Sequence, residues 1–327
     1  MVVALEIERK FPLDRAGKER GAGGERTDSF RLKRKESAAE GVRRIAAERA
    51  VKAHEELCAA IRGDDPAVAI HAARKEMKKL RAVLRLVRDA LGEEAFRAES
   101  RRYRDAGRLL APSRDAEVRV ETLDALEERF GAEMGGEAVR AWRAALERER
   151  DEVAGVAEGE MRARIDAALI ALEAGAAEIP GWPLKADSWE LLEPGLSRSY
   201  RRSRREWKRT RSAASAESVH EWRKRVKDLW YQLRIVRKAW PAVIGETADQ
   251  AHELADLLGD HHDLALLAED LRAREAVEGW QALAALIERR QRELLEQALE
   301  LGARLLAEKP KAFRARFKAY WLAWRGA

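Results

Sequence analysis

The sequence predicts an all-α protein built from two tandem antiparallel helical bundles related by pseudo-twofold symmetry. An 18-residue stretch at 70–87 recurs at 219–236 without a gap, and a repeat of this length indicates a duplicated structural unit. In both copies, apolar residues recur at alternating spacings of three and four, which places them on one face of a helix. Ala, Glu, Arg and Leu dominate the composition, and no strand pattern follows residue 36. We therefore expect helices throughout both units.

The first 36 residues form a separate lead in this prediction. Short alternating segments at 2–11 and 30–35 flank a glycine-rich stretch, a pattern typical of a loose β-hairpin or of a disordered segment. Glu6, Glu8 and Lys10 form an ExExK motif, which resembles the opening signature of the CYTH family of triphosphate tunnel enzymes. A closed barrel of many strands cannot be built from about thirty residues. We therefore interpret the motif as a vestige or a chance match.

The first predicted bundle covers residues 37–180. Ser37 and Glu40 form a capping box, which starts a helix that runs to about residue 62. The next helix is expected to start at Pro66 with Asp65 as its N-cap, because aspartate is a good N-cap and proline suits the first helical position. The predicted helices of this unit cover 37–62, 66–91, 93–110, 113–130 and 137–177, with a break near 155–159.

Prolines and glycines between residues 180 and 195 form the clearest linker, and the second predicted bundle covers 181–327. Pro180 and Pro183 disfavour a continuous helix, and the Pro194–Gly195 pair does so again. Beyond this linker we expect helices at 196–211 and 217–240, from Pro241 onward, and at 261–275, 277–307 and 311–325.

Composition and charge limit the classes of function. The chain of 327 residues carries 64 basic and 58 acidic residues, a net charge of +6, so the distribution of charge matters more than its total. Segment 197–211 has eight basic residues and one acidic residue, whereas 251–275 is acidic. Cys58 is the only cysteine, and no apolar run is long enough for a membrane helix. With no signal-peptide core at the start, we expect a soluble cytoplasmic protein.

A second stripe of residues distinguishes the repeated helices from ordinary amphipathic helices. It lies about 120° around the helix from the apolar face, from the 3.6-residue turn. Most of its cations lack acidic partners four residues away, so the stripe can line a groove beside the core. Its members are His71, Arg74, Lys75, Lys78 and Arg85 in the first copy, and His220, Arg223, Lys224, Lys227 and Arg234 in the second.

The spacing HxxRKxxKxL followed by LRxV, present twice in helical surroundings, resembles the CHAD family, the conserved histidine α-helical domain. A second motif agrees, because LLAPSRD at 109–115 corresponds to LLGDHHD at 257–263, and both keep an aspartate. The resemblance covers about 37–327 and implies two helical bundles with a basic surface where they meet. It also implies binding of inorganic polyphosphate and association with polyphosphate granules, rather than catalysis.

The chemistry of polyphosphate suits the residues of the stripes. The polymer carries about one negative charge per unit and no bases, so its binder needs many cations along a groove and no stacking platform. The second unit departs from the first, since Asp228, Trp230 and His262 stand where the first unit has cations. Cations from the neighbouring helices can compensate. The predicted binding set therefore adds Lys52, Lys79, Arg81, Arg114, Arg198, Arg201, Arg202, Arg205 and Arg209 to the two stripes.

Two other functions stay open at this stage. The His-His-Asp sequence at 261–263 resembles that of HD-type metal-dependent phosphohydrolases, with His220 or His252 and Asp270 as further ligands. The aligned segment of the first unit, 113–115, has no histidine, which favours a structural role for its aspartate. A non-specific nucleic-acid interface is the other alternative, but such interfaces usually add aromatic side chains for stacking, and the stripes contain few. We expect no cofactor.

The two stripe histidines lead to a prediction about pH. Each lies one turn from cations of its own stripe, so like charges should lower the pKa of His71 and His220 below the usual value of about 6.5. A bound phosphate chain reverses the local field and raises that pKa again. Binding should therefore take up protons, and affinity should rise as the pH falls.

Overall fold

The structure is helical throughout the part of the chain that it describes. This computed structural model describes residues 30–63, 65–131, 133–134, 136–155, 158–185, 188–274 and 280–326. No strand occurs within these ranges, which confirms the predicted all-α class. None of the helices described is both long and apolar enough to cross a membrane. The α-helices are α2 (Ala38–Ile61), α3 (Pro66–Leu86), α4 (Arg88–Leu91), α5 (Glu93–Leu109), α6 (Ala111–Phe130), α7 (Glu137–Ala154), α8 (Glu158–Glu178), α9 (Trp189–Ser212), α10 (Ala216–Val236), α11 (Pro241–Ala273), α12 (Trp280–Leu305) and α13 (Pro310–Arg325), with short 3₁₀ turns η1 (Ile179–Gly181) and η2 (Arg237–Ala239).

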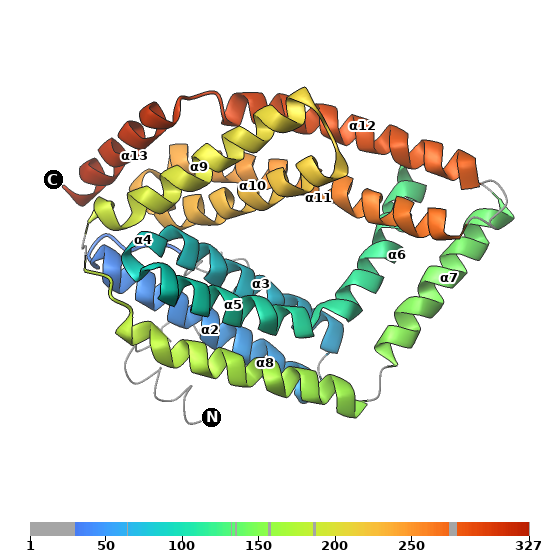
Figure 1. Ribbon diagram of the computed structural model, residues 1–327, viewed down its shortest axis with the longest axis horizontal. Coiled ribbons are helices and arrows are strands. Elements are labelled where there is room, and N and C mark those ends of the chain that lie inside the picture. The colour runs from blue at the N-terminus through green and yellow to red at the C-terminus, as the bar shows by residue number, and fades with distance from the viewer. Residues whose placement is uncertain are drawn as a thin grey trace, which may run out of the picture.

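The helices form two groups that meet along α3 and α10 (Figure 1). Helices α2, α3, α5 and α8 make up one group, and α9, α10, α11 and α12 make up the other, with α13 against α9 (Figure 1). Most buried apolar residues of the two groups belong to one continuous hydrophobic core. The predicted division of the chain near residue 180 stays a prediction, because this core runs across it.

Helices α6 and α7 leave the first group and reach the far ends of α11 and α12 (Figure 1). A smaller hydrophobic core forms there, and it includes Trp142 of α7, Leu267 of α11 and Ile287 of α12. The indole Nε1 of Trp142 also donates a hydrogen bond to the Asp270 carboxylate (2.9 Å). Helices from the first half of the chain therefore help to hold the second half in place.

The predicted helix starts and the apolar face of the repeat are confirmed. Ser37 caps α2 by accepting a hydrogen bond from the Glu40 amide, and the Glu40 carboxylate accepts one from the Ser37 amide. Asp65 caps α3 by accepting hydrogen bonds from the Ala67 and Val68 amides, with proline at the first position of the helix. The apolar residues of both copies are buried in the core: Ile70, Ala73, Met77, Leu80, Leu84, Val219, Trp222, Val226, Leu229 and Leu233.

The end of the lead belongs to the core rather than to a hairpin. Phe30 and Leu32 are fully buried, and the Leu32 amide donates a hydrogen bond to the Ile235 carbonyl of α10 (2.9 Å). The alternation at 30–35 thus comes from one segment docking on helices, and the expected strand at these positions is wrong. Residues 1–29, with the ExExK motif, lie outside the described residues.

The Pro194–Gly195 pair lies inside α9, so the prediction of a linker at this point is wrong. The helix starts at Trp189 and includes Pro194. Close packing explains the glycine at position 195. A Cβ there would lie 2.0 Å from the Leu86 carbonyl oxygen. Only glycine lets the backbone of α9 approach the end of α3 this closely.

Three predicted helix boundaries also move. Helix α3 ends at Leu86, and the short α4 follows before Gly92, whose φ of 81° suits only glycine well. Helix α10 ends at Val236, which leaves Trp240, the last predicted member of the apolar face, 45% exposed. Residues 241–273 form a single helix rather than two.

Candidate functional site

The repeated helices α3 and α10 contact each other directly at the centre of the molecule. The Gln232 side-chain amide donates a hydrogen bond to the Ala82 carbonyl (3.3 Å). The Arg85 guanidinium donates to the Asp228 carboxylate (2.9 Å), so the residue that replaces a lysine in the second copy forms an ion pair across the junction. Burial raises the pKa of Asp228, and Arg85 opposes this rise. One charge substitution between the copies therefore joins the two groups of helices.

A groove of about 360 Å³ lies over this junction, and most of the residues that line it are basic. A hollow of about 250 Å³ between α3 and α5 continues it, because Lys78 and Arg81 line both. We call the two together the basic groove. The residues that line it are Arg74, Met77, Lys78, Arg81, Arg85, Tyr103, Arg104, Gly107, Arg108, Ala111, Arg223, Lys224, Arg225, Lys227, Asp228 and Tyr231.

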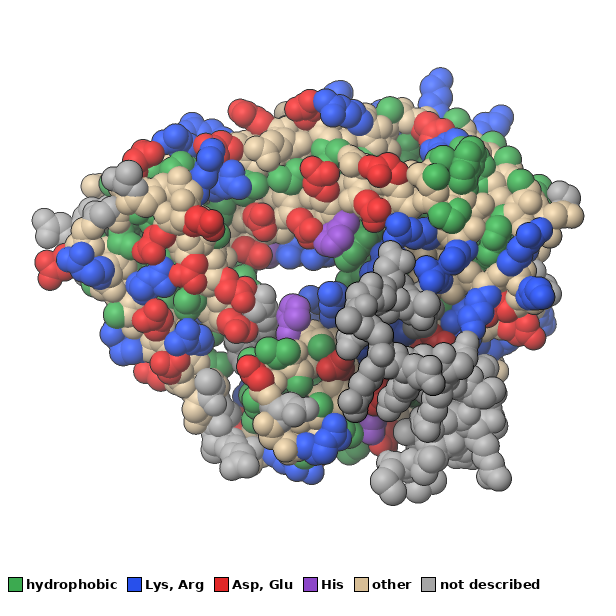
Figure 2. Space-filling model, turned by 180° about the vertical axis from the view of Figure 1, so that it is seen from behind, with side chains coloured by type: hydrophobic (Ala, Val, Ile, Leu, Met, Phe, Trp, Pro, Cys, Tyr) green, Lys and Arg blue, Asp and Glu red, His purple; other side chains and the backbone are tan. Residues whose placement is uncertain are grey.

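The centre of the molecule is open in the space-filling view, and Lys, Arg and His side chains lie at the rim of the opening (Figure 2). Acidic side chains lie along part of the same rim (Figure 2). The surface around the opening is therefore strongly charged, and the two signs of charge are unevenly placed.

Lys78 and Lys227 are equivalent positions of the repeat, and their charges repel each other across the groove. The pKa of Lys78 is lowered to about 8, first because the groove walls desolvate the ammonium and then because Lys227, Arg74 and Arg223 repel its charge. Water still reaches the Lys78 side chain, so the desolvation is that of a groove wall and not of a core. The pKa of Lys227 is lowered for the same two reasons, burial and Arg223.

Several of these cations have no acidic partner. Lys78, Arg81 and Lys227 form no ion pair with any residue that the structure describes, and the buried Nε atoms of Arg81 and Arg223 have no hydrogen-bond acceptor there. Burial, followed by repulsion from Arg85, lowers the pKa of Arg81 to about 10. Nearby carboxylates, such as Asp115 for Lys78 and Asp256 for Lys227, offset the repulsion among these cations only in part, and an anion in the groove would relieve it further.

The two ends of the basic groove differ in charge. On the α5 side, Arg104 and Arg108 add two cations that were not in the predicted binding set, and the Asp105 carboxylate pairs with both. The basic run at 101–108 could have identified these two arginines, since positions 104 and 108 share one face of a helix. On the other side, Asp256, Asp263 and Asp260 of α11 partly offset the charge of Lys227. The cationic surface is therefore concentrated between α3 and α5.

Two predicted binding residues lie in internal contacts, and their assignment to the binding set is wrong. Lys79 is only 7% exposed and donates to the Glu76 carboxylate (2.7 Å), which also pairs with Arg49. Arg234 lies over the rings of Phe30 and Trp230, with its guanidinium carbon 5.5 Å from each centroid. The Glu76 carboxylate stabilises the charge of Lys79, and the aromatic rings stabilise that of Arg234.

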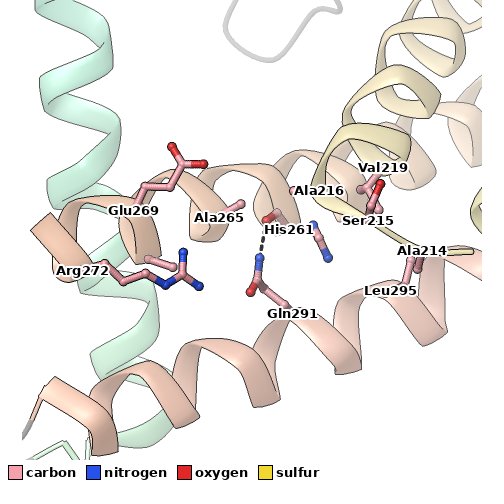
Figure 3. Close-up of a pocket in the computed structure, with 11 residues that line it drawn as sticks. Ala214, Ser215, Ala216, Val219, His261, Ala265, Glu269, Arg272, Gln291 and Leu295 are labelled. Carbon is pink, nitrogen blue, oxygen red and sulfur yellow. Dashed lines mark hydrogen bonds between the residues drawn. The ribbon is translucent and has the colours of Figure 1, made fainter.

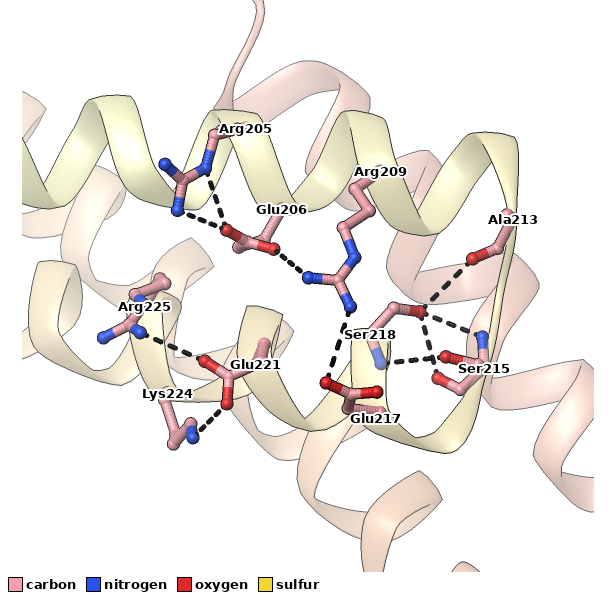
Figure 4. Close-up of polar contacts among 10 residues, drawn as sticks. All are labelled: Arg205, Glu206, Arg209, Ala213, Ser215, Glu217, Ser218, Glu221, Lys224 and Arg225. Carbon is pink, nitrogen blue, oxygen red and sulfur yellow. Dashed lines mark hydrogen bonds and ion pairs between the residues drawn. The ribbon is translucent and has the colours of Figure 1, made fainter.

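Some stripe cations have partners that sequence spacing did not reveal. Arg74 donates to the carbonyls of Leu110 and Ala111 (2.9 and 3.0 Å), so it holds the end of α5 as well as lining the groove. Lys224 pairs with Glu221, three residues before it, and Arg225 pairs with the same carboxylate (Figure 4). The expectation concerned acidic partners four residues away, and the partner of Lys224 lies three residues away.

Carboxylates on α9 itself and on neighbouring elements pair with three of the arginines of the basic run on α9. Arg205 and Arg209 both pair with Glu206, and Arg209 also approaches Glu217 (Figure 4). Arg198 pairs with Asp89. Burial lowers the pKa of Arg202, and repulsion from Arg225 lowers it further. Because Arg225 lines the groove, this repulsion places Arg202 near it.

The remaining predicted positions are not among the residues that line the groove. Lys52, Lys75 and Arg201 are exposed and do not line it, and His71 is exposed as well. The side chain of Arg114 lies outside the described residues.

The histidine of the second copy is half-buried and contacts another histidine. The rings of His220 and His262 lie 4.3 Å apart at their centroids. Burial lowers the pKa of His220, and Lys224 and Arg223 lower it further, so the predicted direction is confirmed with burial as the larger cause. The pKa of His262 falls to about 4, first through burial and then through His220. For His71 the shift stays a prediction.

The residues of the metal-site alternative are not brought together. Among the described residues, no group of three or more His, Cys, Asp or Glu side chains is placed to hold a metal ion. Asp270 is engaged by Trp142 and Arg274, and His252 stacks on Trp230 (4.0 Å between centroids). His220 contacts a second imidazole instead of a carboxylate.

Comparison with known proteins agrees with the fold and the repeated motif. No functionally curated protein shows significant similarity to this chain. The crystal structure of the CHAD domain from the plant Ricinus communis is similar, with a TM-score of 0.53 and 18% identity, covering 91% of this chain and 98% of that one. The family model of the CHAD domain matches residues 44–272, which is more than half of the sequence. The chain therefore belongs to the CHAD domain family.

Proposed function

We propose that this protein binds inorganic polyphosphate in the basic groove without hydrolysing it, and that this binding directs it to polyphosphate granules. The observation that carries the proposal is the convergence of Lys78, Arg81 and Lys227 at the junction of α3 and α10 without carboxylate partners among the described residues. A polyanion would supply the missing counter-charges at several points at once. The CHAD family is linked to polyphosphate binding in general, which agrees with this choice of ligand.

The shape and chemistry of the groove favour a linear phosphate polymer over a nucleic acid. Arginine forks suit phosphate oxygens, and cations spaced along two helices suit a ligand with one charge per unit. Single-stranded nucleic acids usually need exposed aromatic rings on which bases stack. The aromatic residues in the groove lining, Tyr103 and Tyr231, are both buried. Little ring surface is therefore offered to a base.

The test compares binding of long-chain polyphosphate, single-stranded RNA and heparin at several salt concentrations. We expect polyphosphate to bind most tightly, with log affinity falling with log salt at a slope of about −0.7 per phosphate contacted, by analogy with single strands. Replacing Lys78, Arg81 and Lys227 by Ala should make this slope less negative by about 2 and lower affinity about 100-fold at low salt.

A charge-matched control separates a specific groove from a general effect of net charge. Arg150, Arg162 and Arg304 are exposed, form local ion pairs on α7, α8 and α12, and do not line the groove. Replacing these three by Ala removes the same charge and should change affinity less than threefold. Equal losses in the two triple variants would contradict the proposal. Release of orthophosphate on adding Mg²⁺ or Mn²⁺ would replace it with the hydrolase alternative.

A further inference from the structure

Lys78 lies where the two hollows of the basic groove meet, because its side chain lines both. The side chain is exposed, so small solutes can reach it. Its ammonium group forms no ion pair with any residue in the described part of the chain. A carboxylate partner favours the charged form of a lysine, and an accessible lysine without one is open to chemical modification.

Most of the charges that act on Lys78 are positive. Arg74 of α3 repels its ammonium group, as do Lys227 and Arg223 of α10. Asp115 of α6 offsets part of this repulsion. Desolvation by the groove walls lowers the pKa of Lys78 most, and the repulsion helps to bring it to about 8. At pH 7.5, about a quarter of the Lys78 side chains are therefore neutral amines, compared with about 0.1% for a lysine with the usual pKa of about 10.4.

The same surroundings favour an anion at the position of the Lys78 amine. Arg81 lines both hollows with Lys78, and Arg104 and Arg108 of α5 line one of them. Guanidinium groups donate paired hydrogen bonds to planar groups that carry two anionic oxygens. A modification that turns the Lys78 cation into such a group would replace repulsion with attraction.

We propose that Lys78 forms a carbamate with dissolved carbon dioxide in the basic groove. The neutral amine nitrogen attacks the carbon atom and an N–C bond forms. One pair of C=O electrons moves onto oxygen, and a proton passes from nitrogen to water. The product is a planar –NH–COO⁻ group, so a cation of the groove becomes an anion, and the reaction reverses when carbon dioxide is removed. The inference does not require that polyphosphate binds in the groove.

The positions of the other lysines make Lys78 the expected site. Burial also lowers the pKa of Lys79, but that side chain is only 7% exposed and donates to the Glu76 carboxylate. Three carboxylates of α11 act on Lys227, and they would repel a carbamate there. Access and the surrounding charge, and not the pKa alone, therefore distinguish Lys78.

A separate cavity shows why a cation alone is not enough. It has a volume of about 280 Å³, lies between the start of α10, α11 and α12, and shares no lining residue with the basic groove (Figure 3). Arg272 lines it, but no lysine is among the described residues that do so. Because a guanidinium group stays protonated, this cavity offers no amine to carbon dioxide.

The experiment records ¹³C NMR spectra of the full-length protein in ¹³C-labelled bicarbonate at pH 7.5, where dissolved carbon dioxide is present. We expect a carbamate signal that grows saturably with the carbon dioxide concentration, disappears in Lys78→Arg and persists in Lys208→Arg. Both variants keep the positive charge and remove an amine, and Lys208 is exposed but does not line the groove. The α-amino group, whose usual pKa is about 8, gives a second carbamate signal that serves as an internal reference.

Trapping by O-alkylation with a trialkyloxonium salt, followed by mass spectrometry, locates the carbamate. Lys78 should be trapped about tenfold more often than Lys79 or Lys208. Arg223→Gln should lower trapping at Lys78 about threefold, since the amine becomes more basic and the carbamate loses a neighbouring cation. The proposal is overturned if Lys78→Arg keeps the full signal, or if Lys78 is trapped no more often than Lys208. Equal trapping at Lys78 and Lys79 would show that access and charge do not select the site, and would overturn it as well.

Discussion

Lys78 lowers the stability of the free protein because it is charged in a crowded cationic groove, and its replacement should show this directly. The pKa of Lys78 falls from 10.5 to about 8 on folding, and each pKa unit corresponds to about 1.36 kcal/mol. The full shift would be about 3 kcal/mol, but water reaches this side chain, so we expect about 1 kcal/mol after screening. Lys78→Met keeps the apolar stem and removes the charge. It should therefore raise the free energy of unfolding by about 1 kcal/mol at pH 7.

The sign follows from the number of protons bound in each state. The folded protein holds the Lys78 proton less tightly than the unfolded chain, so the destabilisation is fully present below about pH 8 and disappears as the pH rises through 10.5. Urea unfolding at pH 7 and at pH 10.5 should show the gain of Lys78→Met at the lower pH only. The same variant should bind polyphosphate more weakly, with a salt slope less negative by about 0.7.

Two controls make this prediction decisive. Lys208→Met removes an exposed lysine of α9 that does not line the groove, and it should change stability by less than about 0.5 kcal/mol. If Lys78→Met destabilises the protein at pH 7, or if its gain persists at pH 10.5, repulsion in the groove is not the cause. If stability rises but polyphosphate binding is unchanged, the groove is strained but is not the binding site.

Three further predictions follow from other contacts. Asp256→Asn with Asp260→Asn removes two of the three α11 carboxylates that offset the charge of Lys227, and we expect polyphosphate affinity measured by anisotropy at low salt to rise about threefold. Unchanged affinity would show that the ligand does not reach the α11 side. Gly195→Ala places a Cβ 2.0 Å from the Leu86 carbonyl oxygen, so the free energy of unfolding measured in urea should fall by more than about 2 kcal/mol. A fall of less than about 0.5 kcal/mol would contradict the close approach of α9 and α3. Burial and nearby cations lower the pKa of His220 in the free protein, and a bound polyanion should raise it, so polyphosphate affinity should rise as the pH falls from about 7 to 5.5. The double variant His71→Gln with His220→Gln should lose most of this pH dependence. A double variant that keeps all of it would assign the histidines a structural role.

The apolar face of the repeat could be predicted from the sequence because helical spacing alone decides which residues share a face. The capping residues of α2 and α3 could be predicted for the same reason, since the hydrogen bonds are local. The path of α6 and α7 could not, because their partners on α11 and α12 lie more than a hundred residues away. Gly195 likewise appears as a helix breaker in the sequence, and only its contact with α3 explains its place inside α9.

The candidate site was predicted in outline, and the errors have a common cause. Helical spacing identified Lys78 and Lys227, which meet in the groove. The pairs of Glu76 with Lys79 and of Glu206 with Arg209 are three residues apart on one helix, so a search for partners four residues away missed them. A carboxylate on a neighbouring turn or helix changes a cation from a binding residue to a structural one, and pairs between helices, such as Arg85 with Asp228, are revealed only by the tertiary structure.

The replacement of Lys79 by Asp228 in the second copy explains how α3 and α10 can be held together while Lys78 in the groove forms no ion pair. Asp228 of α10 pairs with Arg85 of α3 and fixes the junction, whereas a lysine there, as at the equivalent Lys79, would place two cations together. At the equivalent contact Lys79 does lie near Arg234, and the buried Glu76 offsets that repulsion from the core side. Asp228 lines the groove but is engaged by Arg85, and Glu76 is buried and engaged by Lys79 and Arg49. The junction is thus held together by acids that do not neutralise Lys78, and its charge remains available to a polyanion.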